Sequence, residues 1–261
     1  MSGRLKAVLK KRRKGFPSLL HETEEGLFGF SDAYRVAGVD EVGRGCIAGP
    51  VVVASAVLPG RLVSEIEAGT APKWILDVRD SKLLSAEARE ELEPLLKQWL
   101  QEFHVAFIPV SEIDRINILQ ATFLGMERSV SALSLRPNRV WIDGNQVPKG
   151  LRDVGRAVVG GDLKLLSIAC ASILAKVARD RFMKELSTTY PDYGFSDHKG
   201  YGTPEHLRAL DSLGVTPEHR RSFAPVRDRL APALQSSQGA FEFKTPAESP
   251  NQSEDFENFF A

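Results

Sequence analysis

The sequence predicts a mixed α/β domain in which helices cover the faces of one β-sheet. Two observations carry this prediction. Two short apolar segments of strand length come first, and further strand-like segments then alternate with longer amphipathic segments of helical period. Glycine- and proline-containing connections separate these segments, for example at 43–50. A chain of 261 residues is long enough for one large domain of this kind with short extensions.

Five apolar segments are predicted to be strands. They are residues 35–40, 51–58, 105–110, 139–142 and 154–159. All are rich in valine and other residues that suit a pleated, buried surface. Each also has the length of an ordinary strand.

Three longer segments, 85–100, 117–133 and 167–186, are predicted to be helices. Ser85 can accept a hydrogen bond from the first turn of the first helix. One apolar stripe on that helix consists of Leu92, Leu95, Leu96 and Trp99. The third helix begins with the small residues 169–172, which would let it approach a sheet closely.

The two ends of the chain differ in composition from its middle. We divide the chain into a basic extension (1–32), a folded domain (33–232) and an acidic, aromatic tail (233–261) that we expect to be disordered. The first 21 residues carry seven Lys or Arg and no acidic residue. A solvated tail and a phosphate-binding arm are both open interpretations of that extension.

The sequence also excludes some classes of protein. No apolar run reaches the roughly 18 residues of a membrane span, and the N-terminus lacks the apolar core of a secretory signal. Cys46 and Cys170 have no metal-ligand spacing, which favours two reduced thiols. We therefore expect a monomeric, cytoplasmic protein without a membrane partner.

Acidic residues lie at the ends of three predicted strands: Asp40 and Glu41, then Asp143, then Asp162. Strand ends at the rim of an α/β sheet are where ligands gather. Four carboxylates brought together repel one another unless a divalent cation lies among them, and oxygen ligands alone favour Mg²⁺ or Mn²⁺. Neighbouring strand residues point to opposite faces, so Asp40 and Glu41 can share a site only if the strand bends there.

Asp180 is the alternative to Asp162 as the fourth carboxylate. It follows Lys176 by four residues on a predicted helix, and arginines flank it on both sides. This is the composition of an ion-pair network on a helix surface. We therefore assign Asp180 a structural role and prefer Asp162.

A Gly-Arg-Gly turn, residues 43–45, follows the first acidic pair. It offers bare backbone amides and one guanidinium to a phosphate-sugar backbone. An exposed loop charge is the simpler interpretation of an isolated acidic pair. The turn and the two other acid-ended strands favour a site for metal and nucleic acid instead.

Eight segments between residues 35 and 227 together resemble bacterial ribonuclease HII. They are Ala37–Gly45, Asp80–Leu84, Glu112–Leu119, Ile142–Asn145, Gly160–Asp162, Ala171–Asp180, Tyr193–Pro204 and His219–Phe223. The resemblance implies a ribonuclease H-like mixed sheet flanked by helices, with a small C-terminal helical part. It also implies cleavage of RNA in RNA–DNA hybrids and of duplex DNA 5′ of a single embedded ribonucleotide, leaving a 3′-hydroxyl and a 5′-phosphate.

The resemblance also implies roles for individual residues. The catalytic, metal-binding acids correspond to Asp40, Glu41, Asp143 and Asp162, with Mn²⁺ or Mg²⁺ as the cofactor. The substrate-binding set corresponds to Gly43, Arg44, Gly45, Ser81, Lys82 and Tyr201. The turn would contact the ribose 2′-hydroxyl, which distinguishes RNA from DNA. Tyr201 would pack on the next deoxyribose, and Ser81 and Lys82 would contact a phosphate. Further candidates for backbone contacts are His198, Lys199, Arg220 and Arg221.

Some features fall outside this set or leave alternatives open. Cys46 follows the turn and is interpreted as a small buried residue. Phe256, Phe259 and Phe260 have the spacing of a sliding-clamp-binding peptide, although Ser253 stands where a glutamine is expected. A plain disordered tail is the alternative there. For the domain, the alternatives are the sister family ribonuclease HIII and a non-catalytic hybrid-binding or structural α/β protein.

Overall fold

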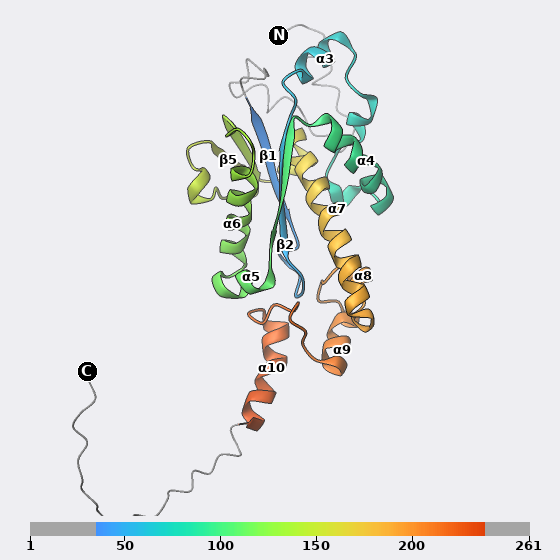
Figure 1. The fold of residues 1–261 in the computed structure, drawn as a ribbon, viewed down its shortest axis with the longest axis vertical. Coiled ribbons are helices and arrows are strands. Elements are labelled where there is room, and N and C mark those ends of the chain that lie inside the picture. The colour runs from blue at the N-terminus through green and yellow to red at the C-terminus, as the bar shows by residue number, and fades with distance from the viewer. Residues whose placement is uncertain (1–34, 238–261) are drawn as a thin grey trace, which may run out of the picture.

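A five-stranded sheet with helices on both faces forms the centre of the protein (Figure 1). The computed structural model describes residues 35–237. The strands are β1 (Val36–Val42), β2 (Val51–Val57), β3 (Glu102–Ile108), β4 (Arg139–Asp143) and β5 (Gly155–Val158), in the spatial order β3-β2-β1-β4-β5. β1, β4 and β5 are parallel, whereas β2 runs antiparallel to both β1 and β3. The predicted mixed α/β fold is confirmed.

Helices cover both faces of this sheet and extend one end of it. They are α3 (Leu62–Ala68), α4 (Ala86–Trp99), α5 (Val110–Ile116), α6 (Ile118–Ser131), α7 (Leu166–Thr189), α8 (Phe195–His198), α9 (Pro204–Leu213) and α10 (Ala224–Ser237). Short 3₁₀ segments lie at Lys73–Asp77, Ser81–Leu83, Lys149–Leu151, Gly161–Leu163 and Pro191–Tyr193. α7 packs on β1 and β2, and α6 packs on β2 and β3 on the other side. The helices α8 to α10 form the predicted C-terminal helical part (Figure 1).

The boundaries of several elements differ from the predicted ones. β1 does not end at Asp40 but continues through Glu41 to Val42. β3 covers 102–108 rather than 105–110, because Pro109 lacks a donor for the ladder and instead precedes helix α5. In α4, Ser85 caps the helix as predicted, but Leu95 is 37% exposed and does not belong to the buried stripe.

The ends of the chain are only partly within the described residues. The predicted basic extension lies outside them, and so does most of the predicted tail. α10 runs to Ser237, past the predicted domain boundary at 232. No helix in the described range is both long and apolar enough to cross a membrane.

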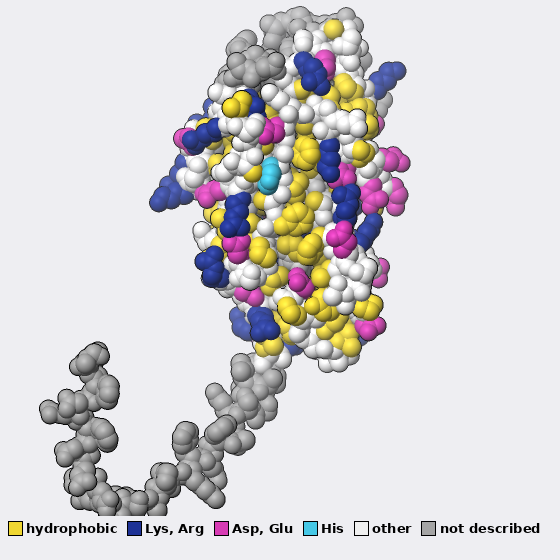
Figure 2. Space-filling model, in the orientation of Figure 1, with side chains coloured by type: hydrophobic (Ala, Val, Ile, Leu, Met, Phe, Trp, Pro, Cys, Tyr) yellow, Lys and Arg dark blue, Asp and Glu magenta, His cyan; other side chains and the backbone are white. Residues whose placement is uncertain are grey.

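One face of the molecule carries hydrophobic side chains along its middle, between charged side chains on either side (Figure 2). β3 is an edge strand, and its Phe107 is 42% exposed. The Phe107 ring packs against Phe182 of α7, with 5.9 Å between the ring centroids. The two rings help to line a groove of about 450 Å³ between β3 and α7.

The closest packing in the fold is between α7 and β1. A Cβ on Gly38 of β1 would lie 2.1 Å from the backbone carbon of Ser167 and 2.3 Å from the nitrogen of Ile168. The small residues that follow, Ala169, Cys170 and Ala171, are fully buried in the core between α7 and the sheet. The predicted close approach of this helix is therefore observed, and glycine at position 38 is a steric requirement.

We expect Gly38→Ala to destabilise the protein by about 3 kcal/mol or more, because neither backbone can move away without disrupting the core. Gly202→Ala is the matched control, since its added Cβ would meet Ile47 at an ordinary 3.5 Å. The control should change the free energy of unfolding by less than about 0.5 kcal/mol. Urea unfolding of both variants measures the difference, and equal stabilities would contradict the packing argument.

Candidate active site

Three aspartates meet at the carboxyl ends of the parallel strands. Val39 of β1 pairs with Ile142 of β4, so the residues that follow each of them, Asp40 and Asp143, lie side by side. Asp162 lies in the 3₁₀ segment just after β5, at the same edge. Carboxylate oxygens of these three aspartates all lie within 4.8 Å of one another. Parallel pairing therefore brings together side chains that are more than a hundred residues apart.

Two glycines fix the local geometry around Asp143. Gly144 follows it with a φ of +108°, a conformation that side-chain-bearing residues rarely adopt. The amide of Gly161 donates a 2.7 Å hydrogen bond to Oδ1 of Asp143. A Cβ on Gly161 would lie 2.4 Å from Cδ1 of Ile168 and 3.3 Å from Oδ1 of Asp143, so a larger residue here would crowd both side chains.

Burial and mutual repulsion act on these carboxylates together. Burial raises the pKa of Asp40 well above its usual range, and the charges of Glu41 and Asp143 raise it further. A hydrogen bond from Ser172 opposes the shift without cancelling it. Burial likewise raises the pKa of Asp162, assisted by Asp80 and Asp143. Such a cluster is stabilised by any group that supplies positive charge.

Glu41 lies beside this group rather than within it. Its Oε1 accepts a 3.3 Å hydrogen bond from Arg44, while its Oε2 is buried without a hydrogen-bond partner among residues 35–237. Burial raises the pKa of Glu41, and the charge of Asp143 contributes to the same direction. The opposite orientation of neighbouring strand residues explains why Glu41 is not within 4.8 Å of all three aspartates.

Asp80 is a fifth carboxylate that the sequence analysis did not assign to the cluster. It is buried, accepts a 2.8 Å hydrogen bond from the amide of Lys82, and shares a hydrogen bond with Asp162. The Nζ of Lys82 lies 3.6 Å from Asp162, and its side chain is 78% exposed. Burial alone would lower the pKa of Lys82, but Asp162 and Asp80 raise it above its usual value. Its signals in the sequence were its place in the segment Asp80–Leu84, which shares the family resemblance, and its capping position before a turn.

Asp180 lies in an ion-pair network, as the helical spacing indicated. Its carboxylate accepts a 2.7 Å hydrogen bond from Lys176, and Arg89 of α4 lies 3.5 Å away. Both of its oxygens therefore have cationic neighbours, and the ion pair with Arg89 joins α7 to α4. Asp180 is not one of the three clustered aspartates.

The Gly-Arg-Gly turn and Tyr201 lie next to the cluster. Gly43 has a φ of +92°, the Arg44 side chain is exposed, and a Cβ on Gly45 would meet no atom within 4 Å. The Tyr201 side chain is 45% exposed, and it shares a hydrogen bond with the thiol of Cys46, the residue after the turn. Cys46 is fully buried and burial raises its pKa, which agrees with its interpretation as a small buried residue.

The other candidate contacts divide into exposed and buried side chains. Lys82 and Arg221 are exposed, and His198 and Lys199 are half-buried. The hydroxyl of Ser81 is buried and lies 2.9 Å from that of Ser172, so in this structure it contacts α7. Arg220 was predicted as a contact to the nucleic-acid backbone, and this is wrong for the folded chain. Its guanidinium is fully buried against backbone carbonyls, which a single sequence could not reveal.

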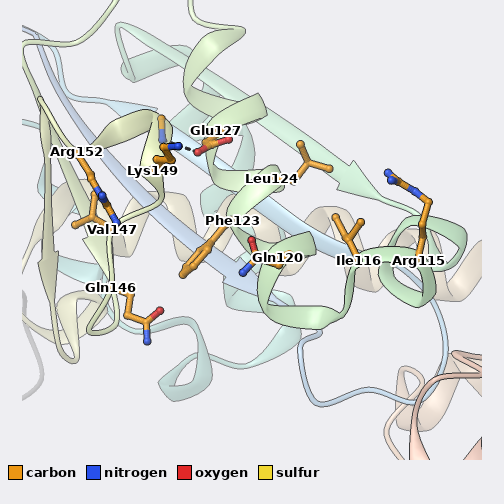
Figure 3. A pocket seen from close by; sticks show the side chains of 11 residues that line it. Arg115, Ile116, Gln120, Phe123, Leu124, Glu127, Gln146, Val147, Lys149 and Arg152 are labelled. Carbon is orange, nitrogen blue, oxygen red and sulfur yellow. Dashed lines mark hydrogen bonds between the residues drawn. The ribbon is translucent and has the colours of Figure 1, made fainter.

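A groove of about 1260 Å³ lies away from the carboxylates, between α6 and the segment after β4 (Figure 3). Its lining includes Arg115, Lys149 and Arg152, and Glu127 accepts a 2.7 Å hydrogen bond from the amide of Gly150 there. None of the clustered aspartates lines it. The carboxylates instead lie at the carboxyl edge of the parallel strands β1, β4 and β5.

Comparison with known proteins assigns the chain to a family. Residues 37–226 match the family model described as Ribonuclease HII. The chain belongs to the ribonuclease HII family. Ribonuclease HII of Neisseria meningitidis serogroup B is 47% identical over 195 residues, which cover 75% of this chain and 95% of that protein.

Solved structures agree with this assignment. The ribonuclease H2 of Pyrococcus horikoshii superposes with a TM-score of 0.64 at 27% identity, covering 77% of this chain and 99% of the other. A ribonuclease HII from Archaeoglobus fulgidus, solved as a complex with PCNA, gives a TM-score of 0.57 at 25% identity over 71% and 93% of the two chains. This ribonuclease HII is therefore a type 2 ribonuclease H, an endonuclease that cleaves RNA in RNA–DNA hybrids.

The donor set of this ribonuclease HII fits a hard divalent cation. The three clustered ligand residues offer only carboxylate oxygens, and the unpartnered Oε2 of Glu41 is a further buried oxygen beside them. Mg²⁺ and Mn²⁺ prefer such oxygen ligands. A bound cation would also relieve the repulsion that raises the pKa of Asp40.

We expect Asp40→Asn to raise the Tm of the metal-free protein by roughly 2–4 °C, because one repelling charge disappears while the side-chain oxygen remains. Excess Mn²⁺ should raise the Tm of the wild type by several degrees, and this rise should be largely lost in the variant. Differential scanning calorimetry measures both changes.

Asp228→Asn serves as the control, since this exposed residue lies outside the aspartate cluster and forms an ion pair with Arg227. It should respond to Mn²⁺ as the wild type does. An undiminished rise with Mn²⁺ in Asp40→Asn would show that the aspartate cluster does not hold the cation.

Proposed function

We propose that this enzyme nicks duplex DNA on the 5′ side of a single embedded ribonucleotide, as well as cleaving longer RNA–DNA hybrids. The products would be a 3′-hydroxyl and a 5′-phosphate. Such a nick would begin the removal of misincorporated ribonucleotides by a monomeric enzyme of the cytoplasm. The observation that carries the proposal is that the carboxylate cluster lies directly beside the Gly-Arg-Gly turn, because β1 leads from Asp40 and Glu41 into the turn and Arg44 of the turn donates to Glu41.

The carboxylates supply the chemistry by holding cations. Asp40, Glu41, Asp143 and Asp162 would hold two divalent ions, Mn²⁺ or Mg²⁺. When bound, such a pair activates a water and stabilises the leaving 3′-oxygen. The chain keeps this group in place through the Gly161 amide on Asp143 and the Ser172 hydroxyl on Asp40. The exposed ammonium of Lys82, whose Nζ lies 3.6 Å from Asp162, would be available to the substrate phosphate.

The turn and Tyr201 would recognise the sugar. The carbonyl oxygens of Gly43 and Arg44 are engaged from the inner side by Arg220, so the outer side of the turn is left for the substrate. The open space at Gly45 lets backbone come close to a 2′-hydroxyl. The half-exposed ring of Tyr201 is placed to pack on the neighbouring deoxyribose.

The direct test is a DNA duplex that contains one ribonucleotide, incubated with Mg²⁺, Mn²⁺ or EDTA. We expect a metal-dependent nick 5′ of the ribonucleotide. Asp143→Asn should lower the rate by about 10³-fold or more, which corresponds to about 4 kcal/mol in the barrier. Binding of the uncleaved duplex should change little, because the amide keeps the oxygen that accepts from Gly161.

Asp180→Asn is the matched control. It makes the same Asp-to-Asn change at a carboxylate that lies outside the aspartate cluster. Its rate should stay near that of the wild type. Cleavage of long hybrids without nicking at single ribonucleotides would favour the activity of the sister family. Wild-type activity in Asp143→Asn would exclude the assigned metal site, and binding without cleavage would favour a non-catalytic hybrid-binding protein.

We further propose that the C-terminal tail binds a sliding clamp. The tail lies outside the described residues, and the proposal is supported by its three phenylalanines, Phe256, Phe259 and Phe260, and by the clamp complex of the Archaeoglobus relative. Deleting residues 250–261 should abolish capture by an immobilised sliding clamp and leave nicking of short duplexes unchanged. Equal capture of the full-length and truncated chains would refute the proposal.

A further inference from the structure

Two arginines are fully buried behind the Gly-Arg-Gly turn. Arg179 of α7 donates hydrogen bonds to the carbonyl oxygens of Ala48, Pro50 and Lys199. Arg220 donates to the carbonyl oxygens of Gly43, Arg44 and Gly49. Neither forms an ion pair with a carboxylate within residues 35–237. Burial lowers the pKa of Arg220 to about 10, so it stays charged at neutral pH.

Arg220 holds the turn by two adjacent carbonyl oxygens. Its Nη2 lies 2.7 Å from the oxygen of Gly43, and its Nη1 lies 3.0 Å from that of Arg44. The planar guanidinium binds several carbonyls in one fixed arrangement, which an ammonium group cannot do. There is no room for the turn to collapse inward, since a Cβ on Gly43 would lie 2.2 Å from the Nε of Arg179.

The neighbouring His219 reaches the Tyr201 loop through a chain of two imidazoles. The amide of Thr216 donates to Nδ1 of His219 at 3.1 Å, so the proton of His219 must lie on Nε2. That Nε2 lies 3.0 Å from Nε2 of His206, which must therefore accept. The remaining proton of His206 lies on Nδ1, which donates to the carbonyl oxygen of Tyr201 at 2.8 Å.

The two ends of this chain fix the same tautomers independently. A backbone amide can only donate and a backbone carbonyl can only accept, so both imidazoles must be neutral for all three bonds to form. Burial lowers the pKa of His206 and of His219 to about 4, which agrees with neutral rings. The carboxylates of the metal site do not contact either ring. The His198 ring, with its centroid 4.1 Å away, stacks on His206 from the other side.

We propose that residues 216–220 are a positioning element that fixes the Gly-Arg-Gly turn and the Tyr201 loop relative to each other. Arg220 holds the turn, and the adjacent His219 holds the Tyr201 loop through His206. The same segment also pairs with the chain after the turn, through the Arg220 amide on Ile47 and the Gly49 amide on Glu218. The inference rests on the proposed function, because it assigns the spacing between two proposed sugar contacts to this segment.

Two substitutions of His206 separate positioning from simple packing. The amide of Asn lies near the place of Nδ1 and can still donate to Tyr201, whereas the amide of Gln lies near Nε2 and keeps only the contact with His219. Both remove the ring and both leave a buried polar group. Each change therefore breaks the chain at one end, Asn at His219 and Gln at Tyr201. A purely structural role predicts general loosening of the fold, whereas a positioning role predicts that both changes release the Tyr201 loop alone.

The readout is alkylation of the two buried thiols, quantified by peptide mass spectrometry. Cys46 shares a hydrogen bond with Tyr201, so it reports on this loop, whereas Cys170 of α7 lies in the hydrophobic core and reports on global unfolding. In His206→Gln, Cys46 should be alkylated about tenfold faster than in the wild type, as expected for one lost buried hydrogen bond, with Cys170 unchanged. His206→Asn should also accelerate the alkylation of Cys46 and leave that of Cys170 unchanged, because it breaks the chain at His219.

Arg220→Lys tests the other half of the element, because it keeps the charge and loses the fork. This variant should also raise the alkylation rate of Cys46 and leave that of Cys170 unchanged. The proposal would be overturned if the alkylation rates of Cys46 and Cys170 rose equally. It would also be overturned if the alkylation rate of Cys46 did not rise in either His206→Gln or Arg220→Lys.

An activity measurement completes the test. On a duplex with one ribonucleotide, His206→Gln should raise KM about tenfold and change kcat less than about threefold, because the Tyr201 contact is to a sugar and not to the reacting atoms. Unchanged KM would overturn the positioning role. Failure of the wild type itself to nick would refute the proposed function alone, because thiol alkylation needs no substrate and decides the inference separately.

Discussion

The parallel pairing of β1 with β4 is the constraint on which the rest of the site depends. It places Asp40 beside Asp143, and the continuation after β5 adds Asp162 at the same edge. The resulting repulsion is tolerated because the carboxylates are fixed by strand geometry and by hydrogen bonds from Gly161 and Ser172. The fold thus stores unfavourable electrostatic energy at one place, and a divalent cation releases it.

A second arrangement, made of cations and imidazoles, supports the loops beside those carboxylates. Loops that contact a ligand are usually more mobile than the scaffold that carries them. Here the Gly-Arg-Gly turn is tied to the C-terminal segment through Arg220, and the chain just after the turn is tied to α7 through Arg179. The two guanidinium charges lie just behind the surface that a phosphate backbone would approach, with no carboxylate paired to either in the described chain. They would therefore add to the attraction for a polyanion.

The sequence was sufficient for the features that depend on local pattern. Alternating apolar segments predicted the mixed sheet, and the acidic strand ends predicted that Asp40, Asp143 and Asp162 would converge. Features that depend on packing between distant segments could not be predicted in the same way. Asp80 joins the cluster only because the segment 81–83 packs beside Asp162, and Arg220 is charged yet fully buried. Glu41 lies beside the cluster because neighbouring strand residues point to opposite faces. The sequence indicated this constraint, but it could not show whether the strand bends at Asp40 or continues straight to Val42, as β1 does.

The central claim is that the clustered carboxylates hold divalent cations. Anomalous X-ray scattering at the manganese edge, from crystals of the full chain grown with Mn²⁺, tests it most directly. The account predicts anomalous density among the carboxylates of Asp40, Asp143 and Asp162. Density only elsewhere on the protein, or none at a saturating concentration of Mn²⁺, would contradict it.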